Sequence, residues 1–196
     1  MGLDKLSLAI LISGRGSNMD ALIKACEASD FPARIAIVIS NRPDAAGLEK
    51  AKKAGLNTTV VDHKSYPDRE TFEQALLDVL ETVPVDLVCL AGFMRVLTPF
   101  FIQHWPGRLI NIHPSLLPDY KGLHTHERVL QDGKSESGCT VHHVVPEMDS
   151  GPIIVQKRVP VLPGDTPETL AARVLAQEHS AYPEAVRILA KTLRKG

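Results

Sequence analysis

Short apolar segments alternate with segments of helical periodicity over the first half of the chain. Four nearly continuous apolar segments lie at residues 6–12, 33–39, 58–61 and 85–90. Between them, residues 17–28, 44–54 and 68–82 carry apolar side chains at helical spacing. Strands that are apolar on both faces are typical of a parallel sheet that helices cover on both sides. The alternation therefore predicts βαβ units and a Rossmann-like, parallel sheet in this half.

The second half of the chain departs from this alternation. Three further strands are expected, at residues 109–112, 137–145 and 153–159. A short helix is expected at 125–131, and a long last helix at 167–193 that Thr166 can cap and that Pro183 can kink or divide. The chain length of 196 residues suits one domain. The predicted fold class is α/β, with a single domain over residues 1–196 and a mostly parallel sheet flanked by helices.

Charge, hydropathy and cysteine usage exclude several classes of protein. The formal net charge is −1, without the clustered Lys and Arg that hold nucleic acid. No apolar run approaches the ~20 residues that span a bilayer, and residues 1–4 show no sign of a signal peptide. Cys26, Cys89 and Cys139 are far apart, as is typical of free thiols in a reducing compartment. We expect a soluble, cytoplasmic protein with no nucleic-acid or membrane partner.

A glycine-containing loop, residues 13–18 (SGRGSN), joins the first expected strand to a helix. Free N–H groups and the helix dipole bind anions at such a junction. Only Gly14 and Gly16 match the G-x-G-x-x-G dinucleotide fingerprint, because Met19 stands at the third glycine position. The loop therefore fits a single phosphate better than NAD or ATP. The alternative is a tight turn, capped by Ser17, that binds nothing.

A second polar group is expected at the end of the strand at 109–112. Asn111 and His113 are two residues apart, so they share one face of a strand, and ligands of open α/β sheets bind at strand carboxyl ends. An amide can stabilise an oxyanion and a histidine can move a proton, which suits acyl transfer. Asp149, in a turn between two strands, could orient His113. The alternatives are a histidine bonded to backbone and an aspartate that only forms the turn.

Metal binding and covalent catalysis find little support in the sequence. The histidine pairs His124/His126 and His142/His143 lack the i, i+4 ligand spacing of a helical metal site. The chain has no G-x-S-x-G motif, and nothing marks Cys139 as a nucleophile. We therefore expect no metal, and direct transfer to a bound amine rather than a covalent enzyme intermediate.

Several longer motifs resemble those of the phosphoribosylglycinamide formyltransferases, folate-dependent enzymes of purine synthesis. The matching segments are residues 12–18 (ISGRGSN), 90–97 (LAGFMRVL), 111–118 (NIHPSLLP), 122–126 (GLHTH), 138–151 (GCTVHHVVPEMDSG) and 172–179 (ARVLAQEH). NIHPSLLP with a later D-x-G is shared by the wider formyltetrahydrofolate-using family, which includes methionyl-tRNA formyltransferase and formyltetrahydrofolate hydrolase. The GSN loop and GLHTH are typical of the glycinamide ribonucleotide branch.

The resemblance implies a formyltransferase fold, 10-formyltetrahydrofolate as co-substrate, small-molecule substrates and a monomer or homodimer. It implies a catalytic trio of Asn111, His113 and Asp149. It places the substrate phosphate at Gly16, Ser17 and Asn18, and the ribonucleotide at Glu178. It places the folate at Arg69, Met94, Arg95, Val96, Leu97 and Asn111. Two positions depart from the family pattern: His143 replaces an aromatic or apolar residue, and Leu175 replaces a polar residue near the phosphate.

Three other functions compete with this interpretation. A formyltetrahydrofolate hydrolase would use water and would not need the phosphate loop. A nucleotide-binding module without activity would keep the loop but would not need the amide, histidine and carboxylate. A sugar-nucleotide formyltransferase would need a pocket for a nucleotide diphosphate, for which the sequence shows no separate motif.

Overall fold

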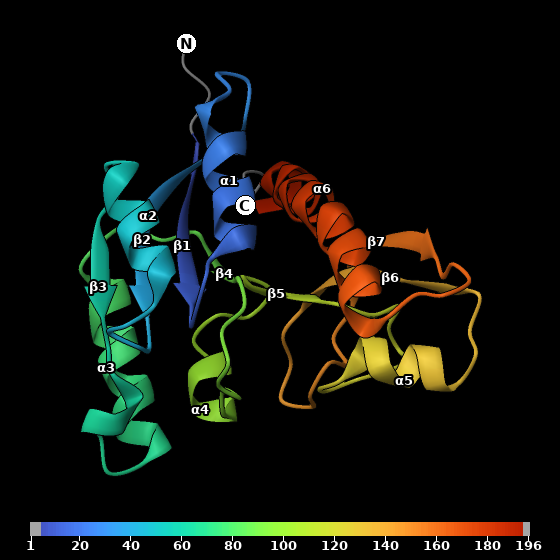
Figure 1. Ribbon diagram of the computed structural model, residues 1–196. Helices are drawn as coiled ribbons and strands as arrows, with labels where there is room; N and C mark the ends of the chain where they lie inside the picture. Colours follow the sequence, from blue (N-terminus) through green and yellow to red (C-terminus); the bar gives the residue numbers. More distant parts are fainter. Residues whose placement is uncertain (1–4, 194–196) are drawn as a thin grey trace.

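The computed structural model describes residues 5–193, and its centre is a seven-stranded sheet with helices on both sides (Figure 1). The strand order is β3-β2-β1-β4-β5-β6-β7. The first five of these strands are parallel to one another, and β6 and β7 are antiparallel to their neighbours. This arrangement confirms the predicted α/β class with a mostly parallel sheet.

The parallel half of the sheet contains β1 (Leu6–Ile12), β2 (Ala33–Ser40), β3 (Thr58–Val60), β4 (Leu87–Leu90) and β5 (Leu109–His113). All seven residues of β1 are buried. Leu8 and Ile10 enter the apolar cluster on one face, and Ala9 and Leu11 enter the cluster on the other. Coverage of both faces is the physical reason for the nearly continuous apolar pattern of this strand.

The antiparallel half is a hairpin of β6 (Glu136–His143) and β7 (Ile153–Pro160). The two backbones approach closely at Gly138, where an added Cβ would lie 2.0 Å from the carbonyl oxygen of Lys157. The pairing of β6 with β7 is irregular between Val141 and His142. Bulges of this kind re-aim side chains and are frequent beside active sites.

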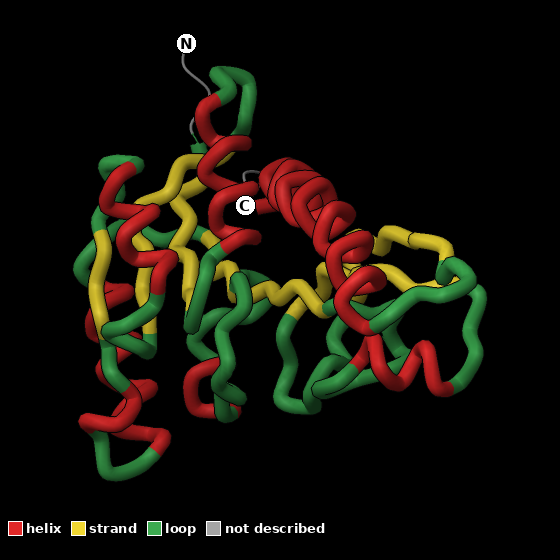
Figure 2. Tube along the Cα trace, viewed as in Figure 1, coloured by secondary structure: helices red, strands yellow, loops and turns green. Residues whose placement is uncertain are grey.

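The helices form two layers (Figure 2). The cluster on one face draws residues from α1 (Ser17–Glu27), α2 (Ala46–Lys53), α5 (Thr125–Gln131) and α6 (Pro167–Leu193). The cluster on the other face draws residues from α3 (Arg69–Glu81) and α4 (Pro99–Ile102), and η1 (His63–Ser65) precedes α3. Tyr182 of α6 is fully buried, and its hydroxyl donates a 2.8 Å hydrogen bond to the carbonyl of Leu90 at the end of β4.

The last helix follows its prediction closely. The Thr169 N–H donates to the Thr166 hydroxyl at 3.3 Å, which is the expected cap, and Pro183 lies inside the helix without dividing it. The two short helical segments η1 and α4 were not predicted, because three or four residues are too few to show a period. Residues 1–4, where no signal peptide is expected, lie outside the described part of the chain. Within residues 5–193, no helix is long and apolar enough to cross a membrane.

Candidate active site

Asn111 stands where the parallel and antiparallel halves of the sheet meet. In register, it pairs with Leu90 of β4 on one side and with His142 of β6 on the other. His113 follows two residues later, so it shares a face of β5 with Asn111. The register therefore gathers the predicted polar side chains at the carboxyl ends of the strands, where ligands bind in sheets of this type.

A cavity of about 650 Å³ opens at this end of the sheet. Its lining contains the three predicted catalytic residues and the four residues predicted to contact the pterin: Asn111, His113, Asp149, Met94, Arg95, Val96 and Leu97. The volume is typical of a small-molecule site. Met94 and Val96 leave 67% and 56% of their surface exposed, so the cavity offers uncovered apolar surface beside its polar groups. The structure thus brings together two sets of residues that the sequence could place only separately.

His113 is a buried residue of this cavity's lining, with an oxygen near each ring nitrogen. Its Nε2 lies 2.9 Å from the carbonyl oxygen of Tyr120, and its Nδ1 lies 3.5 Å from Oδ2 of Asp149. A carbonyl oxygen can only accept, so Nε2 carries the proton of that bond. With Nε2 protonated, Nδ1 is the nitrogen that faces the carboxylate of Asp149, and a second proton there would form a charged pair with it.

Asp149 is held in place by the backbone around it. It adopts a left-handed conformation with φ 50°, and its Oδ2 accepts a 2.9 Å hydrogen bond from the N–H of Gly122. Two residues later, a Cβ added at Gly151 would lie 1.7 Å from the carbonyl oxygen of His143. Asp149 is therefore a turn residue and a neighbour of His113 at once, although the sequence spacing could not establish the second property.

His142 belongs to the same group of side chains, and sequence reasoning considered it only as a metal ligand. It is 2% exposed, and its Nδ1 lies 2.9 Å from the carbonyl oxygen of His143. Its Nε2 lies 3.3 Å from Nδ2 of Asn111 and 3.7 Å from Oδ1 of Asp149. Burial lowers the pKa of His142, although its hydrogen bond to the backbone and the nearby carboxylate act in the opposite direction. Only the register of β5 against β6 reveals this neighbour of Asn111.

The predicted phosphate loop leads directly into α1. Gly16 is the N-cap residue with φ 68°, and no side chain caps the helix, so Ser17 is not the cap that the tight-turn alternative assumed. The first helical bond runs from the N–H of Asp20 to the carbonyl of Gly16 at 2.9 Å, which leaves the preceding N–H groups without helical partners. Gly47 packs against the loop, since its added Cβ would lie 3.1 Å from the carbonyl oxygen of Gly14. The loop retains the features of an anion site.

Asn18 and Glu178 join this loop to α6. Both are buried, and Nδ2 of Asn18 donates a 2.6 Å hydrogen bond to Oε2 of Glu178. The other side-chain atom of Asn18, Oδ1, is buried without a hydrogen-bond partner among the described residues. Burial raises the pKa of Glu178, and the bond from Asn18 opposes that effect. Two of the four residues predicted to contact the ribonucleotide are thus direct neighbours.

The loop and the large cavity are connected at Ser13. The N–H of Met94 donates a 2.7 Å hydrogen bond to the hydroxyl of Ser13, which ties the loop after β4 to the loop after β1. The residues of the phosphate loop and Glu178 do not line the large cavity itself. Arg69 also lies outside its lining, exposed at the first position of α3, so its contact with a folate stays a prediction.

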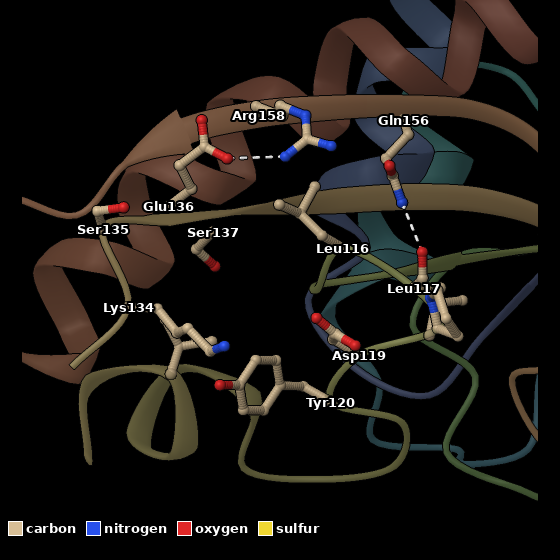
Figure 3. A pocket seen from close by; sticks show the side chains of 12 residues that line it. Leu116, Leu117, Asp119, Tyr120, Lys134, Ser135, Glu136, Ser137, Gln156 and Arg158 are labelled. Atoms are coloured by element: carbon tan, nitrogen blue, oxygen red, sulfur yellow. Dashed lines mark hydrogen bonds and ion pairs between the residues drawn. The ribbon is translucent and has the colours of Figure 1, made fainter. Parts of the chain in front are cut away.

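A second, smaller cavity of about 340 Å³ lies elsewhere and contains none of the predicted site residues. Figure 3 shows Tyr120 and Lys134 on one side of it and Glu136 and Arg158 on the other. Its lining contains no histidine, and the carboxylate of Glu136 is paired with Arg158 at 2.8 Å. We therefore place the candidate active site in the larger cavity.

The described residues also bear on the other chemistries that the sequence raised. Within residues 5–193, no three histidine, cysteine or carboxylate side chains are arranged to hold a metal ion. Burial raises the pKa of the Cys139 thiol to about 12, which makes it a poor nucleophile near neutral pH. His126 lines the large cavity and was overlooked as a site residue; burial lowers its pKa, and its Nδ1 has no hydrogen-bond partner in the described part of the chain.

Comparison with known sequences identifies relatives of this chain. Residues 6–186 match the family model of formyl transferases. The phosphoribosylglycinamide formyltransferase of Escherichia coli (strain K12) is 46% identical over 178 residues, which cover 91% of this chain and 84% of that protein. The trifunctional purine biosynthetic protein adenosine-3 of Bos taurus is 50% identical over 95% of this chain. The chain spans only 18% of the length of that trifunctional relative.

Solved structures agree with the sequence matches. The phosphoribosylglycinamide formyltransferase of Brucella melitensis superposes with a TM-score of 0.92 at 50% identity, covering 95% of this chain and 96% of that one. Glycinamide ribonucleotide transformylase 1 of Symbiobacterium toebii gives a TM-score of 0.94 at 46% identity, covering 96% and 89%. These matches and the geometry of the large cavity lead to one conclusion: the chain belongs to the formyl transferase family, among the phosphoribosylglycinamide formyltransferases.

Proposed function

We propose that this protein transfers a formyl group from 10-formyltetrahydrofolate to the glycyl amine of 5′-phosphoribosylglycinamide, a step of de novo purine biosynthesis. One observation carries the proposal. Asn111, His113 and Asp149 line a single cavity together with the apolar segment 94–97, and Ser13 connects that segment to the helix N-terminus at Gly16. A site for a flat organic donor, a proton-transfer group and a phosphate loop therefore lie along one edge of the sheet.

The large cavity suits the folate. A pterin is a flat ring that needs apolar surface on its faces and hydrogen-bond groups at its edge. The side chains of Met94, Val96 and Leu97 provide apolar surface, and the backbone of the same segment provides polar groups. This segment lies in the same lining as Asn111, so a pterin bound there would bring the formyl group of the donor to the polar end of the cavity.

The N-terminus of α1 suits the phosphate of the ribonucleotide. The first N–H groups of a helix are free, and its dipole favours a negative charge. Gly16 permits the turn that leads into these N–H groups, because its φ of 68° is one that residues with a Cβ rarely adopt. Oδ1 of Asn18 and the carboxyl group of Glu178 lie beside this loop, and both can accept hydrogen bonds from ribose hydroxyls.

The chemistry needs no covalent enzyme intermediate. The neutral glycyl amine attacks the formyl carbon, and the carbonyl oxygen becomes negatively charged as the new C–N bond forms. Asn111 donates a hydrogen bond to this oxygen, and protonated His113, held beside Asp149, stabilises it further. The amine then loses a proton, N10 of the folate gains one, and the bond between N10 and the formyl carbon breaks. The products are formylated ribonucleotide and tetrahydrofolate.

The competing functions differ in which features of the site they would use. A hydrolase would transfer the formyl group to water and would have no use for the helix N-terminus at Gly16 or for the buried pair of Asn18 and Glu178. A binding module would have no use for His113 with an oxygen at each ring nitrogen. Formyl transfer to a phosphorylated amine uses all of these features.

The test is an absorbance assay of 10-formyltetrahydrofolate turnover with and without glycinamide ribonucleotide. We expect turnover only with the ribonucleotide. We also expect Asn111→Ala and His113→Ala to reduce kcat roughly 10²–10³-fold while the folded state is retained, as loss of an oxyanion donor does elsewhere. Equal turnover without the ribonucleotide would identify a hydrolase, and near-normal kcat in either variant would refute the assigned mechanism.

A further inference from the structure

The hydrogen bonds of His142 determine which of its ring nitrogens carries a proton. Its Nδ1 lies 2.9 Å from the carbonyl oxygen of His143, which can only accept, so the proton is on Nδ1. The ring is 2% exposed, and a charged imidazolium is costly at such a buried position. The second nitrogen, Nε2, is therefore a bare lone pair and an acceptor.

That lone pair selects the orientation of the Asn111 amide. Nδ2 of Asn111 lies 3.3 Å from Nε2 of His142, and only an N–H can face a lone pair. If the amide were reversed, its oxygen would face the lone pair of Nε2 and the bond would be lost. We infer that His142 is a positioning residue, which holds the Asn111 amide with its nitrogen toward β6 and so keeps the second N–H of that nitrogen available to the oxyanion. This inference rests on the proposed function of Asn111.

The surrounding structure holds His142 in this role. The two residues are direct partners in the β5–β6 register, which runs without a shift from Ile110 to His113. Three titratable groups lie near the ring: the carboxylate of Asp149, and the imidazoles of His113 and His143. Oδ1 of Asp149 is 3.7 Å from Nε2, beyond hydrogen-bond distance, so the neutral ring does not compete with His113 for this carboxylate.

The first experiment compares His142→Phe with His143→Phe. Phe has no acceptor but fills a similar space, so His142→Phe removes the bond to Asn111 with little loss of packing. We expect kcat to fall roughly 10- to 100-fold, part of the cost of losing an oxyanion donor, while KM for both substrates changes by less than about 3-fold. His143→Phe is the matched control, because its ring does not line the cavity and its backbone carbonyl is kept. Its kcat should stay within about 2-fold of the parent value.

A double-mutant cycle separates positioning from a general structural role. If His142 acts through Asn111, then His142→Phe should have almost no effect on kcat, within about 2-fold, in a chain that already carries Asn111→Ala. His142→Gln offers an amide oxygen as acceptor, so it should recover part of the lost kcat. Additive losses in the cycle, or an unchanged kcat in a folded His142→Phe variant, would overturn the inference.

A spectroscopic measurement tests the inference without any turnover. Long-range ¹H–¹⁵N spectra of histidine-labelled protein distinguish a ring protonated at Nδ1 from one protonated at Nε2 or at both nitrogens. We expect a neutral His142 ring with the proton on Nδ1 near neutral pH, and a shift of its Nε2 signal in Asn111→Ala. A proton on Nε2 would refute the inference even in an active enzyme. Absence of ribonucleotide-dependent turnover with the expected spectrum would refute the proposed function instead.

Discussion

Nδ2 of Asn18 donates a 2.6 Å hydrogen bond to Oε2 of Glu178, although 160 positions separate the two residues in the sequence. The bond connects the first turn of α1 with the middle of α6. Both side chains are buried, so this polar contact lies inside the protein rather than on its surface. The bond lies beside the free N–H groups of the helix N-terminus, so substitutions of its two residues test whether the ribonucleotide binds there.

Removal of the carboxyl group at position 178 should affect the ribonucleotide more than the folate. In Glu178→Ala, Nδ2 of Asn18 loses its partner, which costs roughly 1–3 kcal/mol of stability. We expect KM for the ribonucleotide to rise at least about 10-fold, with KM for the folate nearly unchanged. Initial-rate kinetics with each substrate varied in turn measure both constants. A parallel rise in the two KM values would contradict a local role in ribonucleotide binding.

Neutralisation of Asp149 should reduce kcat and preserve the fold. In Asp149→Asn, the side-chain oxygen can still accept the N–H of Gly122, but the negative charge 3.5 Å from His113 is lost. We expect kcat to fall roughly 10²-fold or more, because the imidazolium is no longer stabilised. The measurement is kcat together with the melting temperature. Asp119→Asn, at an exposed position outside the large cavity, is the control and should keep its kcat.

A methyl group at position 151 should disrupt the geometry of the Asp149 turn. In Gly151→Ala, the new Cβ would lie 1.7 Å from the carbonyl oxygen of His143, so the backbone must shift. We expect a loss of stability of roughly 1–3 kcal/mol and a lower kcat, since overpacking displaces backbone and the turn carries Asp149. Urea denaturation and initial rates test this result. Gly14→Ala is a control for stability, because an added Cβ there meets no atom within 4 Å; equal losses in the two variants would contradict the argument.

His143→Phe should stabilise the protein, and the gain should grow as the pH falls. Nδ1 of His143 is buried without a partner among the described residues, and its removal should contribute about 1 kcal/mol. Burial lowers the pKa of this imidazole below its usual value, so between about pH 7.5 and pH 5.5 the unfolded chain takes up a proton that the folded state resists. The parent therefore loses stability as pH falls, and the variant does not share this loss. Urea midpoints at both pH values measure the difference; an equal gain at both would disprove the pH argument.

The strands and helices could be predicted because their causes are local. The nearly continuous apolar residues of β1 and the end of α2 shortly before Gly55, where φ is 74°, follow from burial and backbone conformation within a few residues. Pairing between distant segments follows no such local rule. The contact of Asn111 with His142 depends on the register of β5 against β6, and the approach of Asp149 to His113 depends on a turn held by Gly122. The family resemblance implied the catalytic trio of Asn111, His113 and Asp149. His142, which contacts Asn111, was identified only from the structure.

The position of Asn111 at the boundary between the two halves of the sheet also determines what the protein loses when part of the sheet unfolds. The phosphate loop belongs to the parallel half, whereas His142 and Asp149 belong to the hairpin of β6 and β7 and its connecting turn. α6 packs against both strands of the hairpin and carries Glu178, the partner of Asn18, so a chain in which the hairpin had opened would lose the reacting centre together with the support of Glu178 beside α1. We therefore expect turnover and ribonucleotide binding to be lost at the same denaturant concentration.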